Sequence, residues 1–529
     1  MNKLLIFRIF TLWLTLTTVV TKGLGNETKE KLAEELFNGP VLQLKLEIKG
    51  KDLEELQREN RKYVHGTLSE GTNVYAEVAV HMKGAAGSFR GLDQNPGFTV
   101  NVDKFDKHQT FHGLSKFNLN NSVQDPTYLT DLICSELFRK AGVPASRIGY
   151  VQLKFNGRNL GLYLIVEGFN KDFFRKNFGS DSGNFYDGGF LKDITETLDK
   201  TSGENPKDQS DLKALAAAAN ERDLNKRKAG LEKLLDIDRF ISFVAMDIIC
   251  WDWDGYPIKK NNYRIYHDPT TDKMTFIPHG MDQMFWEVNA PIMPGMEGLV
   301  ARSVLEVPEF RDRYYARMGE IMTNIYDAAA LSNRVDGITS KIVPVIKTFN
   351  QGQARNVQNA ANELKGKLAM RAANIKQQLV SRPKPVKFDA NGELVLGGWG
   401  PRVEAGQPVM KETTQGDGSA GYLLKIVDKG MCISSWRLKL RLPPGHYEFQ
   451  ATGVSSNLLA NPDDKSDGFG IRISGLNKQR GSSSSGSVQL KKFAYPFDVN
   501  DQEVELICEM RASRGETFFR KDGLKLVRK

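Results

Sequence analysis

The chain has 529 residues, more than one compact core of ordinary size holds, so about three domains are expected. Its composition, 40% hydrophobic and 26% charged residues, excludes a chain that is disordered throughout. The net charge of +9 falls to +6 without residues 1–25, which hold three basic residues and no acidic one. This small surplus allows an anionic ligand, but it does not indicate nucleic-acid binding.

The first 25 residues predict a signal peptide. Basic residues open the segment, an apolar run spans residues 10–20, and small residues close it. The run is short for a membrane span, and an uncleaved membrane anchor is the alternative. No other run reaches membrane-spanning length, so we expect export to the periplasm, the cell surface or the medium, with no further transmembrane segment.

Residues 41–190 predict a mixed sheet with one main helix, because segments of alternating polarity dominate this region. The pair Asn156-Gly157 indicates a tight turn that joins two of the strands in a hairpin. The expected elements are a strand at 41–49, a helix at 52–63, strands at 73–83 and 98–102, a helix at 126–141, and strands at 150–155 and 161–166.

The pattern becomes mainly helical after residue 199 and ends at the Pro-rich linker Ser381-Arg382-Pro383-Lys384-Pro385. One β-hairpin is expected within this region, close to its middle. The expected elements are helices at 212–221, 226–235 and 237–250, strands at 263–266 and 274–277, and mostly helix over 309–383.

From residue 386 onward, short alternating runs between Gly, Ser, Asn and Pro turns predict an antiparallel sandwich or jelly roll. The expected fold class is therefore α+β, followed by an all-β domain. The expected parts are a signal peptide (1–25), an α+β domain (38–300), a helical extension (301–382) and a β-sandwich domain (386–529).

Four widely spaced cysteines, Cys134, Cys250, Cys432 and Cys508, lack the spacing of zinc ligands. Cys432 and Cys508 both lie in strand-like runs, and an exported protein could join them in a disulfide. Four buried free thiols are the alternative.

Two acidic segments carry residues that suit phosphoryl transfer. Asp252 and Asp254 follow the helix 237–250, while Asp282 and Asn262 flank the hairpin that should bring these segments together. Phosphoryl transfer needs one carboxylate to orient the attacking hydroxyl, and a carboxylate with an Asn to hold Mg²⁺ on the phosphates. In the alternative, Asp252 and Asp254 only accept hydrogen bonds from loop amides.

Short motifs also follow one another in a fixed order over residues 80–290. They are Asn118-Leu119-Asn120-Asn121, Asp125-Pro126-Thr127, Leu137-Phe138-Arg139, Ala141-Gly142-Val143-Pro144, Gly161-Leu162-Tyr163, Gly183-Asn184-Phe185-Tyr186, Asp254-Gly255, Asn262-Tyr263 and Ile277-Pro278 to Asp282. Each motif alone is weak, but the ordered set resembles the spore-coat protein H (CotH) kinase family. The resemblance implies an atypical kinase-like domain that uses ATP and Mg²⁺ or Mn²⁺ to phosphorylate hydroxyl groups of a protein substrate.

The resemblance also implies roles for single residues in the chemistry. Asp254 fits the catalytic carboxylate, and Asn262, Asp282 and Asp252 fit the metal ligands. The segment Pro278-His279-Gly280-Met281-Asp282 departs from the family pattern, which often reads Pro-Trp-Asp-x-Asp. A glycine offers Mg²⁺ no side chain, so Asp282 would hold the metal with help from Asp252 or His279, or metal binding would be weak.

On the cofactor side, the resemblance implies that Glu167 pairs with a phosphate-binding lysine, for which Lys83 is the candidate. Gly84, Gly87 and Ser88 directly follow and could form a turn that approaches phosphate. Arg147 is a further basic candidate for the cofactor, although a structural ion pair explains it equally well.

An alternative function is a non-catalytic surface or coat protein with a degenerate kinase fold. Its C-terminal domain would then bind a carbohydrate or a protein. Four aromatic residues could stack on a sugar or pack in the core: Trp399, Tyr422, Trp436 and Tyr447.

Overall fold

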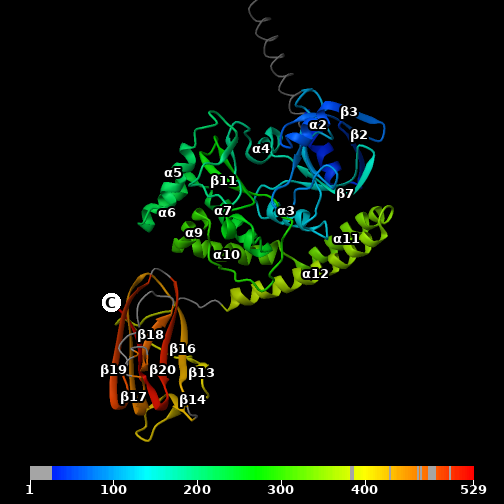
Figure 1. The fold of residues 1–529 in the computed structure, drawn as a ribbon. Coiled ribbons are helices and arrows are strands. Elements are labelled where there is room, and N and C mark those ends of the chain that lie inside the picture. Colours follow the sequence, from blue (N-terminus) through cyan, green and yellow to red (C-terminus); the bar gives the residue numbers. More distant parts are fainter. Residues whose placement is uncertain are drawn as a thin grey trace, which may run out of the picture. The chain divides into compact units, whose positions relative to one another are not determined.

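The computed structural model describes residues 25, 27–381, 386–427, 430–461, 464, 467–474, 484–499 and 502–529. The chain forms two compact units, Met1–Val380 and Ser381–Lys529 (Figure 1). The predicted signal peptide, apart from residue 25, and linker residues 382–385 lie outside the described residues. Within the described ranges, no helix is both long enough and apolar enough to cross a membrane.

The first unit begins with a helix over residues 27–38 and a closed barrel of seven strands. Around the barrel the strand order is β1-β2-β3-β4-β5-β7-β6, and the parallel pair of β6 and β1 closes it. Apolar side chains such as Leu44 and Leu46 fill its core. The strands are β1 (Leu42–Glu47), β2 (Val64–Glu70), β3 (Asn73–Lys83), β4 (Gly97–Asn101), β5 (Lys116–Asn120), β6 (Ile148–Phe155) and β7 (Arg158–Glu167).

A second, four-stranded antiparallel sheet has the order β11-β10-β8-β9. One core of buried side chains joins this sheet to the helices, and the hydrophobic helix α7 contributes twelve buried residues to the unit. The strands are β8 (Asn184–Asp187), β9 (Asp199–Ser202), β10 (Tyr263–Asp268) and β11 (Lys273–Pro278). The helices that precede β10 along the chain are α2 (Gly50–Arg58), α3 (Thr130–Lys140), α4 (Lys171–Phe178), α5 (Ser210–Ala219), α6 (Leu224–Leu234), α7 (Ile237–Cys250) and α8 (Tyr256–Lys259).

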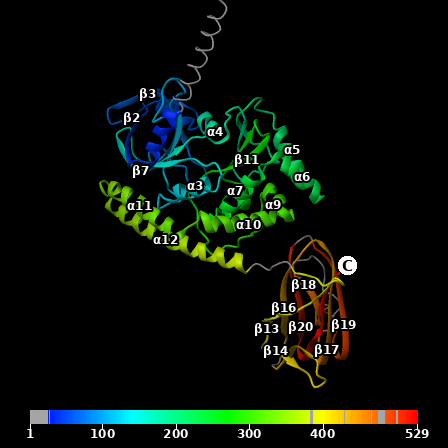
Figure 2. The same ribbon diagram turned by 180° about the vertical axis from the view of Figure 1, so that it is seen from behind.

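The helices predicted as an extension belong to the first unit, because their apolar faces share the core of α3 and α7. They are α9 (Leu299–Glu306), α10 (Pro308–Asn324), α11 (Ala328–Lys347) and α12 (Gln351–Val380). Figure 2 shows α11 and α12 as a long antiparallel pair along one side of the unit, with β7 near α11 and α10 near α12. The 30 residues of α12 span about 45 Å at the helical rise of 1.5 Å per residue.

The second unit is a sandwich of a six-stranded and a four-stranded antiparallel sheet, as predicted. The larger sheet runs β14-β15-β21-β17-β19 with β12 paired to β21, and the smaller runs β13-β16-β20-β18. The strands are β12 (Glu393–Val395), β13 (Gly400–Ala405), β14 (Pro408–Thr414), β15 (Ala420–Ile426), β16 (Cys432–Leu442), β17 (Gly445–Leu459), β18 (Gly468–Ser474), β19 (Gly486–Val499), β20 (Gln502–Ala512) and β21 (Arg514–Arg528).

The sandwich core decides two of the alternatives left open by the sequence. The four aromatic residues that could stack on a sugar are at most 7% exposed and pack in the core: Trp399, Tyr422, Trp436 and Tyr447. Cys432 lies opposite Ala512 and Cys508 lies opposite Trp436 on paired strands. This register separates the two cysteines by about 13 Å along the strands, beyond disulfide reach. All four cysteines are buried free thiols.

Candidate active site

Asp254 stands in the loop that follows α7, and two asparagine amides hold one of its carboxylate oxygens. The Nδ2 groups of Asn261 and Asn262 donate to Asp254 Oδ2 at 2.9 and 3.2 Å. Its side chain is half-buried, and burial raises the pKa of its carboxyl group. Among the described residues no donor reaches Oδ1, so this oxygen can accept a hydrogen bond from an incoming hydroxyl group.

Asn262 also binds the segment that carries Asp282. Its Nδ2 donates to the Gly280 carbonyl at 3.2 Å. Gly280 has a φ of +66°, and a Cβ there would lie 3.0 Å from Asn262 Oδ1. The left-handed backbone and the close amide therefore both favour glycine at the position where the family pattern has an aspartate.

Lys83 ends β3 and points into the same cluster of charged side chains. Its Nζ donates to Asn120 Oδ1, an interaction that the sequence did not indicate. Burial lowers the Lys83 pKa to about 8, while the negative charges of Asp131 and Asp282 oppose that shift. A cation surrounded by these carboxylates suits a phosphate group whose charge a metal ion shares.

The predicted turn after Lys83 is present and compact. The Ala85 amide donates to Ser88 Oγ at 3.0 Å, and Gly84 and Gly87 have φ values of +110° and +84°. A Cβ on Gly84 would lie 2.9 Å from the Phe89 backbone, so a side chain would displace the chain there. Asn121 Nδ2 donates to the Ser88 carbonyl and ties the turn to the segment that also binds Lys83.

Asp131, in the first turn of α3, belongs to the site although the sequence did not single it out. Its neighbour Thr130 donates through Oγ1 to the Asp282 carbonyl at 3.2 Å, so the start of α3 is joined directly to the Gly280–Asp282 segment. Burial raises the Asp131 pKa to about 7, and the charge of Asp282 adds to the shift. Burial also raises the Asp282 pKa to about 6. The available signal was an acidic residue four positions after the Asp125-Pro126-Thr127 motif.

Asp252 is more deeply buried than the other charged residues of the site. It is 3% exposed, its Oδ1 accepts from the Asp254 amide at 3.2 Å, and it therefore also shapes the loop. Burial raises its pKa, and the charges of Asp254, Asp282 and Asp131 act in the same direction. Asp252, Asp254, Asn262, Asp282 and Lys83 are thus brought together in one cluster, with Asp252 in the most enclosed place.

Arg147 and Glu167 lie elsewhere, and the predicted pair of Glu167 with Lys83 is wrong. Glu167 accepts from Arg147 Nε at 3.0 Å and from Arg147 Nη2 at 2.5 Å. Arg147 Nη1 donates to Glu30 and Glu34, at 2.8 and 3.0 Å, on the helix over residues 27–38. All side-chain nitrogens of Arg147 are therefore engaged with carboxylates, as in the ion-pair alternative, and neither residue is available to a cofactor.

The donor set decides which kind of metal site could form. Within the described ranges, no group of three or more His, Cys, Asp or Glu side chains is arranged to hold a metal ion. Mg²⁺ in nucleotide sites usually takes only one or two carboxylates, with phosphate oxygens and water for the rest. Asp282 and Asn262, with a second carboxylate from Asp131 or Asp252, therefore fit Mg²⁺ together with a nucleotide, but not Mg²⁺ alone.

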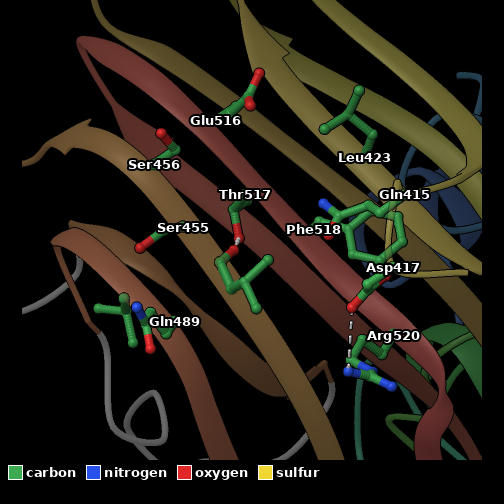
Figure 3. A pocket seen from close by; sticks show the side chains of 12 residues that line it. Gln415, Asp417, Leu423, Ser455, Ser456, Gln489, Glu516, Thr517, Phe518 and Arg520 are labelled. Atoms are coloured by element: carbon green, nitrogen blue, oxygen red, sulfur yellow. Dashed lines mark hydrogen bonds and ion pairs between the residues drawn. The ribbon is translucent and has the colours of Figure 1, made fainter. Parts of the chain in front are cut away.

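A separate hollow of about 330 Å³ lies on the larger sheet of the sandwich (Figure 3). Most of its lining side chains are polar, and Arg520 and Asp417 face each other 3.9 Å apart at one end. Gln415 and Gln489 also line it and present amide groups. The hollow suits a hydrophilic ligand, since amide and carboxylate groups bind hydroxyl groups.

Comparison with known families shows to which protein family the first unit is related. The sequence model described as CotH kinase protein matches residues 80–374, more than half of the chain. The chain belongs to the CotH kinase family. The predicted fold class is confirmed: a mixed α+β unit, which the family marks as kinase-like, precedes an all-β sandwich.

Several relatives share this family region. Inner spore coat protein H of Bacillus subtilis is 22% identical over 263 residues, covering 46% of this chain and 72% of that protein. Invasin CotH3 of Rhizopus delemar is 27% identical over 188 residues, covering 32% of this chain and 31% of the invasin. Invasin CotH2 of the same organism is 23% identical over 319 residues, covering 53% of each. The match thus spans about a third to a half of the two invasins.

Two solved structures were also compared with this CotH kinase family member. The Helicobacter pylori proinflammatory kinase CtkA aligns over 56% of this chain and 96% of its own, with 9% identity and a TM-score of 0.25. The carbohydrate-binding module TmCBM61 with β-1,4-galactotriose aligns over 25% of this chain and 88% of its own, with 11% identity and a TM-score of 0.20.

Proposed function

We propose that the chain is an exported phosphotransferase that uses ATP and Mg²⁺ or Mn²⁺ to phosphorylate hydroxyl groups of a protein substrate. Asp254 carries this proposal, because two Asn amides fix one of its oxygens and leave the other open, close to Asp282, whose charge also acts on Lys83. Membership of the CotH kinase family supports the same class of reaction. Export rests on the signal peptide predicted at residues 1–25.

Each residue of the site has a role that its environment suits. Asp254 would orient the acceptor hydroxyl and receive its proton, since burial brings its pKa closer to that of a base acting near neutral pH. Asp282 and Asn262 would hold the metal, with Asp131 or Asp252 as the second carboxylate. Lys83 would bind a phosphate oxygen. When bound, the metal would neutralise charge that develops on the transferred phosphoryl group.

Thermal shift of residues 26–529 with ATP, with and without Mg²⁺ or Mn²⁺, tests the proposal. At ligand concentrations near 100 times Kd, binding should stabilise the first unit by about 2.7 kcal/mol, several degrees in Tm. Asp282→Asn should lose the metal-dependent shift, whereas Asp254→Asn should keep it and lose phosphate transfer from labelled ATP. Asp199→Asn, an exposed change on β9, is the control.

A wild-type protein without any metal-dependent shift would refute the proposal and favour the non-catalytic surface or coat protein. In that case the second candidate function, glycan binding by the sandwich, gains weight from the polar hollow around Gln489 and Asp417. A glycan array probed with the full chain and with Gln489→Ala tests it. Binding that the variant loses would support this function, and no bound glycan would count against it.

A further inference from the structure

Arg371 of α12 is a cation buried to 0% exposure whose hydrogen-bond acceptors, among the described residues, are all neutral. Its Nη2 donates to the Ile248 carbonyl at 2.7 Å and its Nε to the Ile249 carbonyl at 3.2 Å. Its Nη1 donates to the Ala290 and Val288 carbonyls at 2.6 and 3.3 Å. A buried cation is costly unless it is well bonded, so this set of carbonyl groups is what retains Arg371 in the core.

The carbonyl groups come from both segments that carry the acidic residues of the site. Ile248 and Ile249 lie in the last turn of α7, three to six positions before Asp252 and Asp254. Val288 and Ala290 follow Asp282 in the other segment. The two segments touch beside Arg371, where the Phe285 amide donates to the Cys250 carbonyl at 2.8 Å. One guanidinium group therefore joins both acid-bearing segments to α12.

A positive charge at the C-terminal end of α7 stabilises the backbone there. The last carbonyl groups of a helix lack partners within the helix and carry partial negative charge, which a positive group stabilises. The next residue, Trp251, adopts the left-handed conformation with φ +50° and turns the chain toward Asp252. The Arg371 guanidinium carbon lies 5.8 Å from the centre of the Trp251 ring, within cation–π range. Arg371 thus fixes the turn that sets the direction of the loop carrying Asp252 and Asp254.

We propose that Arg371 is a positioning residue, which sets the spacing between Asp254 and Asp282 without touching either. The inference rests on the proposed phosphotransferase function, because only that function requires both carboxylates at one nucleotide. A planar guanidinium group can donate in several fixed directions at once, whereas a lysine ammonium at this place could not reach the carbonyl groups of both segments. A displacement of about 1 Å in a catalytic group can reduce a rate about 100-fold.

The test uses Arg371→Lys in the full chain, with two readouts below the Tm of the variant. Hydrogen exchange should rise in residues 251–254 and 282–290 and stay unchanged in the barrel strands. The Kd of Mg²⁺ with a non-hydrolysable ATP analogue should rise about 10- to 100-fold, as expected for loosened ligand geometry. Leu44→Ala in the barrel core is the matched control, which should lower the Tm and leave both readouts at the site unchanged.

A milder variant keeps the test decisive if Arg371→Lys does not fold. Asn374 Oδ1 accepts from Arg371 Nη1 at 3.1 Å, so Asn374→Ala should loosen the guanidinium and give a smaller change of the same sign. Unchanged exchange in both acidic segments of a folded variant would overturn the positioning role, whatever its affinity. A wild-type protein without nucleotide binding would refute the proposed function instead, and hydrogen exchange alone would then decide whether Arg371 fixes the two segments.

Discussion

Replacing Asp131 with Asn should stabilise the protein while it weakens the candidate site. Burial raises the folded-state pKa of Asp131 from the ordinary value of 3.8 to about 7. The folded protein therefore retains a proton that the unfolded chain loses between about pH 4 and pH 7, so ionisation of Asp131 opposes folding as the pH rises. At 1.36 kcal/mol per pH unit, this shift costs the wild type about 4 kcal/mol above pH 7.

An asparagine avoids that cost because it stays neutral, while its side chain keeps the size and shape of the aspartate. Between pH 5 and pH 8, the stability advantage of Asp131→Asn should grow by about 2–3 kcal/mol. Urea denaturation across this pH range measures the advantage, with hydrogen exchange of α3 peptides assigning the transition to the first unit. The Asp199→Asn control should show no such growth. An Asp131→Asn difference that does not change with pH would refute the electrostatic reasoning.

Three further substitutions test other parts of the site. Lys83→Met should weaken nucleotide binding in calorimetry about 10- to 100-fold, because a charge-assisted hydrogen bond of about 1.5–3 kcal/mol is lost. Glu167→Gln should destabilise the first unit in urea by about 3 kcal/mol and leave nucleotide affinity unchanged, since Glu167 pairs with Arg147 outside the site. Gly280→Asp should cost about 1–2 kcal/mol in the same assay and should not strengthen Mg²⁺ binding, because its Cβ would press on the Asn262 amide.

The outcomes that would contradict these predictions are distinct. Unchanged affinity in Lys83→Met would remove the lysine from the phosphate side of the site. Weaker nucleotide binding in Glu167→Gln, at unchanged stability, would restore the role that the sequence first suggested for Glu167. Stronger Mg²⁺ binding in Gly280→Asp would show that the Asn262 amide can yield to a side chain.

Local patterns predicted the local elements of the first unit. Asn156 and Gly157 have φ values of +45° and +83°, as a tight hairpin turn between β6 and β7 requires. The closure of the barrel could not be predicted, because it depends on the parallel pairing of β6 with β1, more than 100 residues away. Strands β2 and β5 also went unrecognised, since Phe117 and Leu119 are the only apolar residues of β5, and β2 contains Gly66 and little regular alternation.

The residues of the site likewise differ in whether the nearby sequence or the folding of distant segments determines their position. Asp254 and Asn262 were predictable because they lie eight residues apart in acidic and amide-rich loops around one hairpin. Asp131 was hidden, because an aspartate in the first turn of a helix is common for reasons of helix stability alone. Lys83 lies near Asp131 and Asp282, whereas the partners of Arg147 and Glu167 are decided by folding of distant segments.

The charges of the site bear on whether Gly280, in the place of an aspartate, abolishes metal binding. Four carboxylates, from Asp131, Asp252, Asp254 and Asp282, have raised pKa values, and Lys83 is the cation whose charge opposes the shift of Asp131 and Asp282. Such a cluster is costly to bury, and perturbed carboxylates gather where function requires them. A divalent cation would remove most of that repulsion, whereas protons do so below about pH 6. Metal affinity should therefore increase with pH from about 5 to 7. The absence of a carboxylate at position 280 does not leave the site short of acidic side chains, since α3 supplies Asp131 beside Asp282.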